Sequence, residues 1–494
     1  MQPARPEKTR RPPISVAVRT QEPFSRVAPV LKTALLMGAG GGFVLAAILT
    51  LSLLLSIPPG TWWAAVAQAH GHLQLYGWAG LFVLGVALHF LPRLFGSPLA
   101  GAHLVPWFVG IMSASLILRA VSQAALALTR GNLWYVGLLS SGIGELVAVG
   151  LVLFILLGTA LWGPHPATRP AYWSVFPFLV GASASLILAC VINLVNLTQA
   201  IGGSGLVPDT GDTLNVTLGL FGFLVPMALA MSARSLPMYA GLDGFPHRIL
   251  WPMAGVYFAG LVLLCLGSGG NLISSSWASV PGGLGMILLG GAVLLFIGIF
   301  LRLVRRRGRL PKRVAELSPS PQKLAHTYQQ QVAREHTAYG PFVGLVASAY
   351  LWALLGALCL VIDGVSTLAT GQKLLVFDAI RHSFALGFLA LLICVIAPRM
   401  LPSFSGRTIV SPKLVSATLW LGNTAAVLRV GTLLVAPFLG STVYLWLFGL
   451  SGPCGWLLAL CLAINLWPTL RSSTGDHQRG HLPATTVTPG PGNV

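Results

Sequence analysis

Charged residues are scarce in this chain. Asp, Glu, Lys and Arg together make up 8% of the 494 residues, whereas hydrophobic residues make up 55% and the mean hydropathy is +0.80. A soluble globular domain carries about 25% charged residues, so this composition excludes one. We therefore expect an integral membrane protein.

Cysteine is also sparse, and no two cysteines form a C-x-x-C pair. All six lie within apolar runs, which predicts that they serve as small hydrophobic core residues. They are Cys190, Cys265, Cys359, Cys394, Cys454 and Cys461.

Acidic residues number only 11 against 30 Lys and Arg, and the net charge is +19. The basic residues cluster in an N-terminal arm (1–30), in a linker (305–340) and near a C-terminal tail (471–494), whereas loops such as "IGGSGLVPDTGDT" carry almost none. This positive-inside pattern predicts that both termini are cytoplasmic. It favours the lipid bilayer over nucleic acid as the partner, and the polar tail is expected to be disordered.

Apolar runs long enough to cross a bilayer, about 20 residues each, occur twelve times. They lack the alternation of outer-membrane strands, so we predict an all-α polytopic protein. The runs cover 31–57, 72–95, 104–128, 133–162, 172–199, 212–238, 249–269, 277–304, 341–366, 374–401, 412–437 and 442–468.

Three of these runs carry the same pattern without a gap. The stretches starting at His72, Thr217 and His382 share four features: a glycine at the sixth position, a basic residue at the eighteenth, Leu-Pro at the twentieth and twenty-first, and a glycine at the twenty-fifth. The matching positions are Gly77, Gly222 and Gly387; His89, Arg234 and Arg399; Pro92, Pro237 and Pro402; and Gly96, Gly241 and Gly406.

The repeat unit is therefore four helices, with two copies in 31–304 and one in 341–470. Because four is even, the copies should be parallel and related by a pseudo-threefold axis along the membrane normal. We expect His72, Thr217 and His382 at one level near the outer face. Near the inner face the three prolines should mark helix breaks, with the glycine that follows each of them permitting a left-handed turn.

Two histidines and two arginines share a spacing. Arg119 lies 47 residues after His72, and Arg429 lies 47 residues after His382, whereas the middle copy has Leu264 at the equivalent place. This pattern fits a haem with His72 and His382 as axial ligands and Arg119 and Arg429 beside its propionates. The alternative is that the histidines begin helices at the interface and the arginines snorkel to headgroups.

Other polar residues fall inside the runs or directly before them. His70 is about 200° round a helix from His72, so the two cannot share a metal. His89 lies ~25 Å along the helix from His72, in a cytoplasmic layer with Arg234 and Arg399, and is expected to be a polar helix end. Glu145, the carboxylate well inside a run, should pair with an arginine or move a proton.

The stretches "HGHLQLYGW", "RHSFALGFLALLICVIAPRMLPSFSGR" and "TAAVLRV" resemble the NnrS family, twelve-helix bacterial membrane proteins that contain haem and copper and are linked to nitric oxide metabolism. The resemblance implies metal-site roles for His70, His72 and His382 in a bacterial inner membrane. It also makes Arg399, Gly406, Arg407 and Arg429 motif residues. Leu73 and Phe404 replace the family's usual Glu and His, and Leu73 makes this helix more similar to the haem-ligand helix of haem-copper oxidases.

These patterns lead to two functional hypotheses. The first is a haem protein, with copper possible, that handles nitric oxide or exchanges electrons with a redox partner. Oxygen or nitric oxide reduction is disfavoured because the sixth and seventh helices, which supply most ligands of a second metal in such enzymes, offer only His247. The second is a cofactor-free transporter of an ion or small molecule, with Glu145, Arg119 and His89 along a polar pathway.

Overall fold

The computed structural model describes residues 24–129, 131–163, 165, 170–203, 205–240, 242, 244–268, 275–305, 334 and 337–471. Within these ranges the chain is helical and holds no β-strand, as the apolar runs predict. Four predicted features lie outside the described residues, wholly or for the most part: Gly241, the basic arm up to residue 23, the linker over 306–333 and the tail over 472–494.

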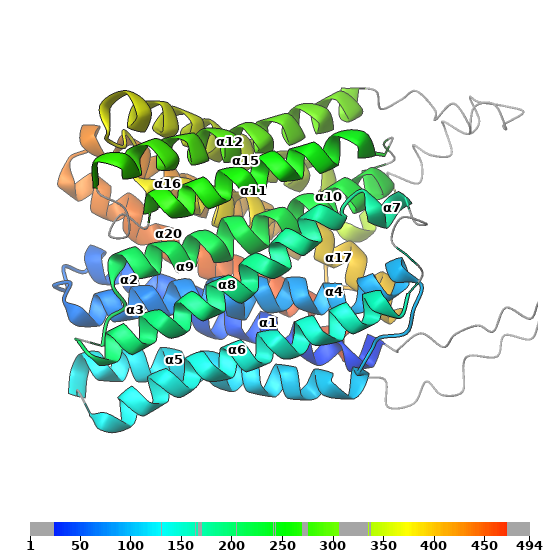
Figure 1. Cartoon of the computed structure of the whole chain (residues 1–494), viewed down its shortest axis with the longest axis horizontal. Coiled ribbons are helices and arrows are strands. Elements are labelled where there is room, and N and C mark those ends of the chain that lie inside the picture. Colours follow the sequence, from blue (N-terminus) through cyan, green and yellow to red (C-terminus); the bar gives the residue numbers. More distant parts are fainter. Residues whose placement is uncertain are drawn as a thin grey trace, which may run out of the picture.

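Twelve segments of the described chain are long and apolar enough to span a membrane, and they run side by side (Figure 1). In chain order they are span 1, with η1 (Phe24–Arg26), α1 (Ala28–Met37), η2 (Gly38–Gly42) and α2 (Phe43–Leu54); span 2, with α3 (Thr61–His72), η3 (Leu73–Gly80) and α4 (Leu81–Phe95); span 3, with η4 (Ala102–Leu104) and α5 (Val105–Thr129); span 4, α6 (Asn132–Leu161); span 5, α8 (Phe176–Ile201), preceded by the short α7 (Pro170–Trp173); span 6, with α9 (Asp209–Thr217), η6 (Leu218–Leu224) and α10 (Val225–Ala240); span 7, α11 (His247–Ser268); span 8, α12 (Ser275–Arg305); span 9, α15 (Phe342–Thr370); span 10, with α16 (Phe377–His382), η7 (Ser383–Ala390) and α17 (Leu391–Ser405); span 11, with α18 (Pro412–Ala426), η8 (Val427–Gly431), α19 (Thr432–Val435) and η9 (Ala436–Phe438); and span 12, with α20 (Ser441–Leu466) and η10 (Trp467–Leu470).

The predicted runs agree with these helices to within a few residues, except at the starts of spans 1 and 2. Span 1 begins at Phe24, so residues 24–30 belong to a helix rather than to the basic arm. Span 2 begins at Thr61, so His72 lies well inside the helix and not near its end. Hydropathy misses this first part of span 2 because Gln68 and His70 lower it.

Spans 2, 6 and 10 form the inside of the bundle. In each of them 89% of the apolar window is buried, compared with 28 to 56% in the other nine spans. The repeated pattern therefore marks the three inner helices, and the less buried helices surround them.

The inner helices share a second feature, a π-helical stretch at the same position. η3, η6 and η7 begin directly after His72, Thr217 and His382, respectively. η6 contacts both η3 and η7, so the three preceding residues lie at one level of the bundle. This arrangement confirms the predicted repeat.

The helices end near the prolines, as expected, but at the left-handed glycines that follow and not at the prolines themselves. α4 continues past Pro92 to Phe95, and α17 continues past Pro402 to Ser405. Each helix ends at the following glycine, because Gly96 and Gly406 adopt left-handed φ values of 65° and 68°. Proline removes one hydrogen-bond donor from a buried membrane helix, which neighbouring helices tolerate.

The outer helices repeat their contacts every four spans. α5 packs on α6, α11 on α12 and α18 on α20 within the repeats. α6 packs on α8, α12 on α15 and α20 on α2 between them, which closes the ring. The bundle therefore has three equivalent interfaces, formed by spans 10–12 with 1 and 2, spans 2–6, and spans 6–10. We call them the cavity, polar and aromatic interfaces after their contents.

Candidate functional site

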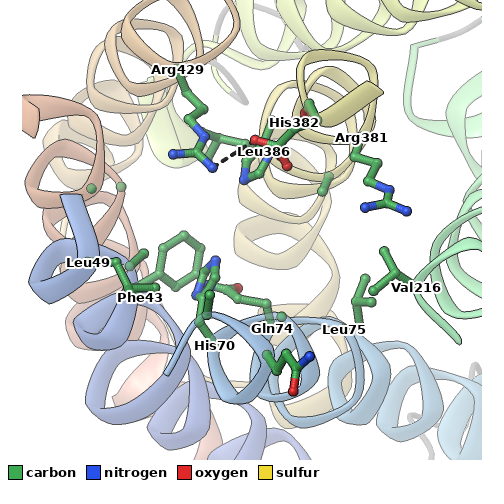
Figure 2. Close-up of a pocket in the computed structure, with 18 of the residues that line it drawn as sticks. Phe43, Leu49, His70, Gln74, Leu75, Val216, Arg381, His382, Leu386 and Arg429 are labelled. Carbon is green, nitrogen blue, oxygen red and sulfur yellow. Dashed lines mark hydrogen bonds and ion pairs between the residues drawn. The ribbon is translucent and has the colours of Figure 1, made fainter. Parts of the chain in front are cut away.

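The cavity interface encloses a space of about 470 Å³. Spans 1, 2, 6, 10, 11 and 12 contribute to its wall, which combines apolar and aromatic side chains with a group of charged residues and two histidines (Figure 2). The wall includes Phe43, His70, Trp78, Asp212, Asp378, Arg381, His382, Arg429 and Gly455. A pocket of this size and mixed character is typical of cofactor and small-molecule sites.

His70 reaches this cavity from α3. Its Nδ1 lies 2.8 Å from the backbone oxygen of Gly42 in η2. A carbonyl oxygen only accepts hydrogen bonds, so Nδ1 must carry the proton. The Nε2 lone pair, which has no hydrogen-bond partner among the described residues, is then available to a ligand in the cavity.

His382 reaches the same cavity from α16, on the opposite wall (Figure 2). Its Nδ1 lies 2.9 Å from the backbone oxygen of Asp378 and 3.2 Å from the carboxylate oxygen Oδ1 of the same residue. Both contacts place the proton on Nδ1. In the neutral tautomer with Nδ1 protonated, both imidazoles carry their lone pair on Nε2 at the wall of one cavity, as metal-ligating histidines do.

Two arginines join these histidines at the cavity wall. The Arg429 Nη2 donates to Oδ2 of Asp378 at 2.8 Å, and its guanidinium lies 4.2 Å from the ring centroid of Phe448. The Arg381 guanidinium lies 5.1 Å from the ring centroid of Phe377. Both side chains line the cavity, so their guanidinium groups can donate to an anionic group there. Their Nε atoms are buried and have no hydrogen-bond partner in the described part of the chain.

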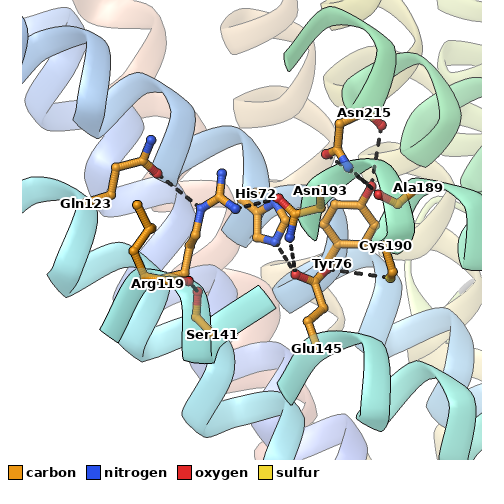
Figure 3. Close-up of polar contacts among 11 residues, drawn as sticks. His72, Tyr76, Arg119, Gln123, Ser141, Glu145, Ala189, Cys190, Asn193 and Asn215 are labelled. Carbon is orange, nitrogen blue, oxygen red and sulfur yellow. Dashed lines mark hydrogen bonds and ion pairs between the residues drawn. The ribbon is translucent and has the colours of Figure 1, made fainter. Parts of the chain in front are cut away.

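The polar interface holds a second cluster, which is closed by its own hydrogen bonds (Figure 3). His72 Nε2 lies 2.7 Å from Oε2 of Glu145, and Asn193 donates to the same oxygen at 2.8 Å. Arg119 donates to Oδ1 of Asn193 and, at 3.1 Å, to Gln123. All five side chains are buried, and the carboxylate contacts polar groups from two helices, His72 of α3 and Asn193 of α8.

The chain of polar groups continues toward the loop that joins spans 5 and 6. Gln123 donates to Oε1 of Gln68, and Gln68 donates to the backbone oxygen of Val207 at 2.8 Å. Gln68 also lines the cavity. The polar cluster and the cavity are therefore neighbours on opposite sides of span 2.

The structure thus pairs the predicted site residues differently from our expectation. His382 and Arg429 lie at the cavity, but His72 and Arg119 belong to the polar interface and do not line it. His70 takes the place expected for His72, because residues two apart on a helix face in nearly opposite directions and only one faces the cavity. Glu145 pairs with His72 and Asn193, and Arg119 reaches it through Asn193.

The remaining predicted residues lie elsewhere. The ring of His89 packs 3.9 Å from that of Phe404, centroid to centroid, and 5.3 Å from that of Phe24. Arg399 places its guanidinium 4.1 Å from the ring centroid of Phe342. Arg407 is half-buried just after α17, where its backbone N–H donates to the side-chain oxygen of Ser405.

Sequence reasoning missed Asp378 and Arg381. Both stand within one helical turn of His382, but neither has a counterpart in the other two copies of the repeat. A search by repeated pattern therefore passes over them, whereas their closeness to His382 was a usable signal.

The aromatic interface is filled by side chains. A continuous series of rings runs from Phe221 through Phe384, Phe388 and Tyr350 to Phe300, with neighbouring centroids between 4.6 and 6.5 Å apart. His247 is exposed at the first residue of α11. Among the described residues, no three His, Cys, Asp or Glu side chains cluster so as to hold a metal ion.

The comparisons with known proteins identify a fold. No family model and no curated protein matches the chain, so the NnrS resemblance stays a prediction. Among solved structures, a haem-copper terminal oxidase, determined by cryo-EM as a dimer, is similar to it with a TM-score of 0.64 over 91% of this chain and 84% of that one. The two sequences are 12% identical, so this likeness shows the helical membrane fold alone.

Proposed function

We propose that this chain is a haem-binding membrane protein in which His70 and His382 are the axial ligands. The observation that carries the proposal is the pair of half-buried imidazoles that line one cavity from two inner helices, each with its Nδ1 proton held by a backbone carbonyl. The fold supports the proposal, because the solved structure that shares it is a haem-copper terminal oxidase. The ligands still come from the second and tenth helices, as the sequence predicts, although with a different residue of span 2.

The residues around the cavity fit a haem. Two neutral imidazoles are suitable axial donors to iron, and the carbonyl that holds each Nδ1–H fixes the ring orientation and increases its basicity. The guanidinium groups of Arg381 and Arg429 at the cavity wall match a pair of carboxylates, with which they form strong charge-assisted hydrogen bonds. Arg381 thereby takes the role that the sequence suggested for Arg119.

A bound haem supplies one-electron redox chemistry, and the surrounding side chains determine how it is used. Trp78 and Phe43 exclude water from one side of the cavity. Electron exchange with a redox partner leaves both histidines in place, whereas nitric oxide binding requires one of them to move away. We infer one of these two roles in a bacterial inner membrane, with both termini cytoplasmic.

Catalytic reduction at a second metal is not part of the proposal. The interface between spans 6 and 10 is occupied by aromatic rings, and His247 lies away from them at a helix end. Copper likewise has no assigned ligands among the described residues.

A transporter is the second candidate, and one observation favours it. A series of hydrogen bonds extends from a loop into the bundle. It connects Val207, Gln68, Gln123, Arg119, Asn193 and Glu145. This series would serve a transported ion without any cofactor.

An optical spectrum of the purified protein distinguishes the haem protein from the transporter. A haem protein shows a strong Soret band that shifts on reduction with dithionite, and extraction releases haem in a fixed ratio to protein. A colourless preparation after expression with added haem precursor would eliminate the haem proposal and leave the transporter.

A further inference from the structure

The segment of span 1 that faces His70 has an unusual sequence and an unusual geometry. The stretch "GAGGG", Gly38–Gly42, interrupts the α-helix with one π-helical turn. Such turns are rare in proteins and are frequent at functional sites. Glycine has the lowest propensity for a helix interior after proline, so four glycines in five residues need a packing reason.

Two of these glycines face span 2, one helical turn apart. A Cβ atom at Gly38 would overlap Cδ1 of Trp78. A Cβ atom at Gly42 would lie 3.0 Å from Cγ, 3.1 Å from Cδ and 3.2 Å from the backbone nitrogen of Gln74. Spans 1 and 2 therefore approach as closely as they do only because these two residues lack side chains.

The other two glycines do not share this constraint. A Cβ atom at Gly40, which is exposed, would meet nothing within 4 Å, and one at Gly41 would make only an ordinary 3.4 Å contact with Leu73. Close packing is therefore specific to the face that carries Gly38 and Gly42.

Gly38 and Gly42 both contact residues that line the cavity. The backbone oxygen of Gly42 holds Nδ1 of His70 at 2.8 Å. Trp78, seated over Gly38, meets Phe43 edge-on with ring centroids 4.9 Å apart, and both rings line the cavity. Gly42 thus orients His70, and Gly38 makes room for Trp78 in the cavity wall beside it.

We propose that the Gly38–Gly42 turn is the positioning element of the cofactor site, with Gly42 orienting His70 through its carbonyl and Gly38 seating Trp78. The inference rests on the proposed haem function. Moving the Gly42 carbonyl away weakens its bond to Nδ1–H, makes His70 a poorer electron donor and favours the reduced iron. Gly42 is thus a positioning residue whose loss raises the reduction potential.

The experiment compares Gly42→Ala with Gly40→Ala in full-length protein. Both changes add one methyl group to the same turn, so helix propensity changes alike. Haem content, the reduction potential and the electron paramagnetic resonance spectrum of the oxidised protein are measured, together with thermal unfolding in detergent. We expect Gly42→Ala to raise the potential and alter the spectrum, and Gly40→Ala to match the wild type.

A rescue variant separates positioning from general damage. Gln74→Ala removes the two side-chain atoms nearest to the new Cβ at position 42, so the double variant Gly42→Ala/Gln74→Ala should recover part of the potential shift. Poor folding of Gly42→Ala alone with recovery in the double variant also supports the inference.

Each contrary result is distinct. Wild-type protein without haem overturns the proposed function and this inference with it. Haem-loaded Gly42→Ala with the potential and spectrum of Gly40→Ala overturns the inference and leaves the function standing.

Discussion

His72 and His382 occupy equivalent positions in equivalent interfaces, yet their surroundings differ completely. His72 meets the carboxylate of Glu145 with its Nε2, whereas His382 anchors its Nδ1 on Asp378 and leaves Nε2 open to a cavity. The residue that faces each imidazole across the interface therefore decides its role, not the residue's place in the repeat.

The difference traces to spans 4 and 12. "SGIGE", residues 141–145, aligns with "SGPCG", residues 451–455, at the same 310-residue separation that relates Arg119 to Arg429. The serines make the same 2.6 Å hydrogen bond to the backbone oxygen three residues earlier, to Leu138 and Phe448. Glu145 thus fills the polar interface at the position where Gly455 leaves the cavity open.

The largest expected effect tests which histidines face the cofactor. His70→Ala and His382→Ala should each remove most of the Soret absorbance, because each deletes an axial ligand, whereas His72→Ala should keep it. Haem content per protein measures the effect. Haem loss in His72→Ala, with full haem in His70→Ala, would restore the pairing of His72 with His382.

A second substitution makes the cavity interface resemble the polar interface. Gly455→Glu should abolish haem binding, because it places a carboxylate in the cavity as Glu145 is placed in the polar interface. Gly455→Ala is the control: its Cβ would lie 3.4 Å from Cδ1 of Phe43, an ordinary contact, so it should retain haem. Equal haem in the two variants would contradict the comparison.

The arginines at the cavity should differ from the arginine of the polar interface in their effect on haem retention, and this effect should be smaller than that of the histidines. Arg381→Leu and Arg429→Leu should weaken haem retention, because each removes a charge-assisted hydrogen bond worth roughly 1.5 to 3 kcal/mol. Arg119→Leu should leave the spectrum unchanged. The rate of haem transfer to an excess of apomyoglobin measures retention, and equal rates in all three variants would refute the assignment.

The smallest effect is expected on stability alone. Glu145→Gln keeps the shape of the side chain but removes the charge that faces His72 and, through Asn193, Arg119. We expect a loss of about 1 to 3 kcal/mol, detected as a lower unfolding temperature, with an unchanged Soret band. A Soret band that shifts in this variant would mean that the polar cluster contributes to the cofactor site.

Much of the fold was predictable from local patterns. The apolar runs located the spans, since a bilayer sets their length and apolarity, and the repeated glycines and Leu-Pro pairs identified the inner helices. The start of span 2 was not predictable, because its polar residues face the bundle interior and lower the hydropathy. The predicted left-handed turns at Gly96 and Gly406 are confirmed, but Pro92 and Pro402 do not themselves break the helices, which continue to the next glycine.

The sequence by itself determined the helical membrane class, the threefold repeat and the presence of histidines on the second and tenth helices. Tertiary structure decided which histidine of span 2 faces His382 and that Arg381, rather than Arg119, joins Arg429. The physical reason is that a repeat specifies equivalent backbone positions, whereas a site depends on what neighbouring helices present across each interface. Glu145 closes one interface, Gly455 opens another, and neither outcome is encoded in the spacing of the histidines.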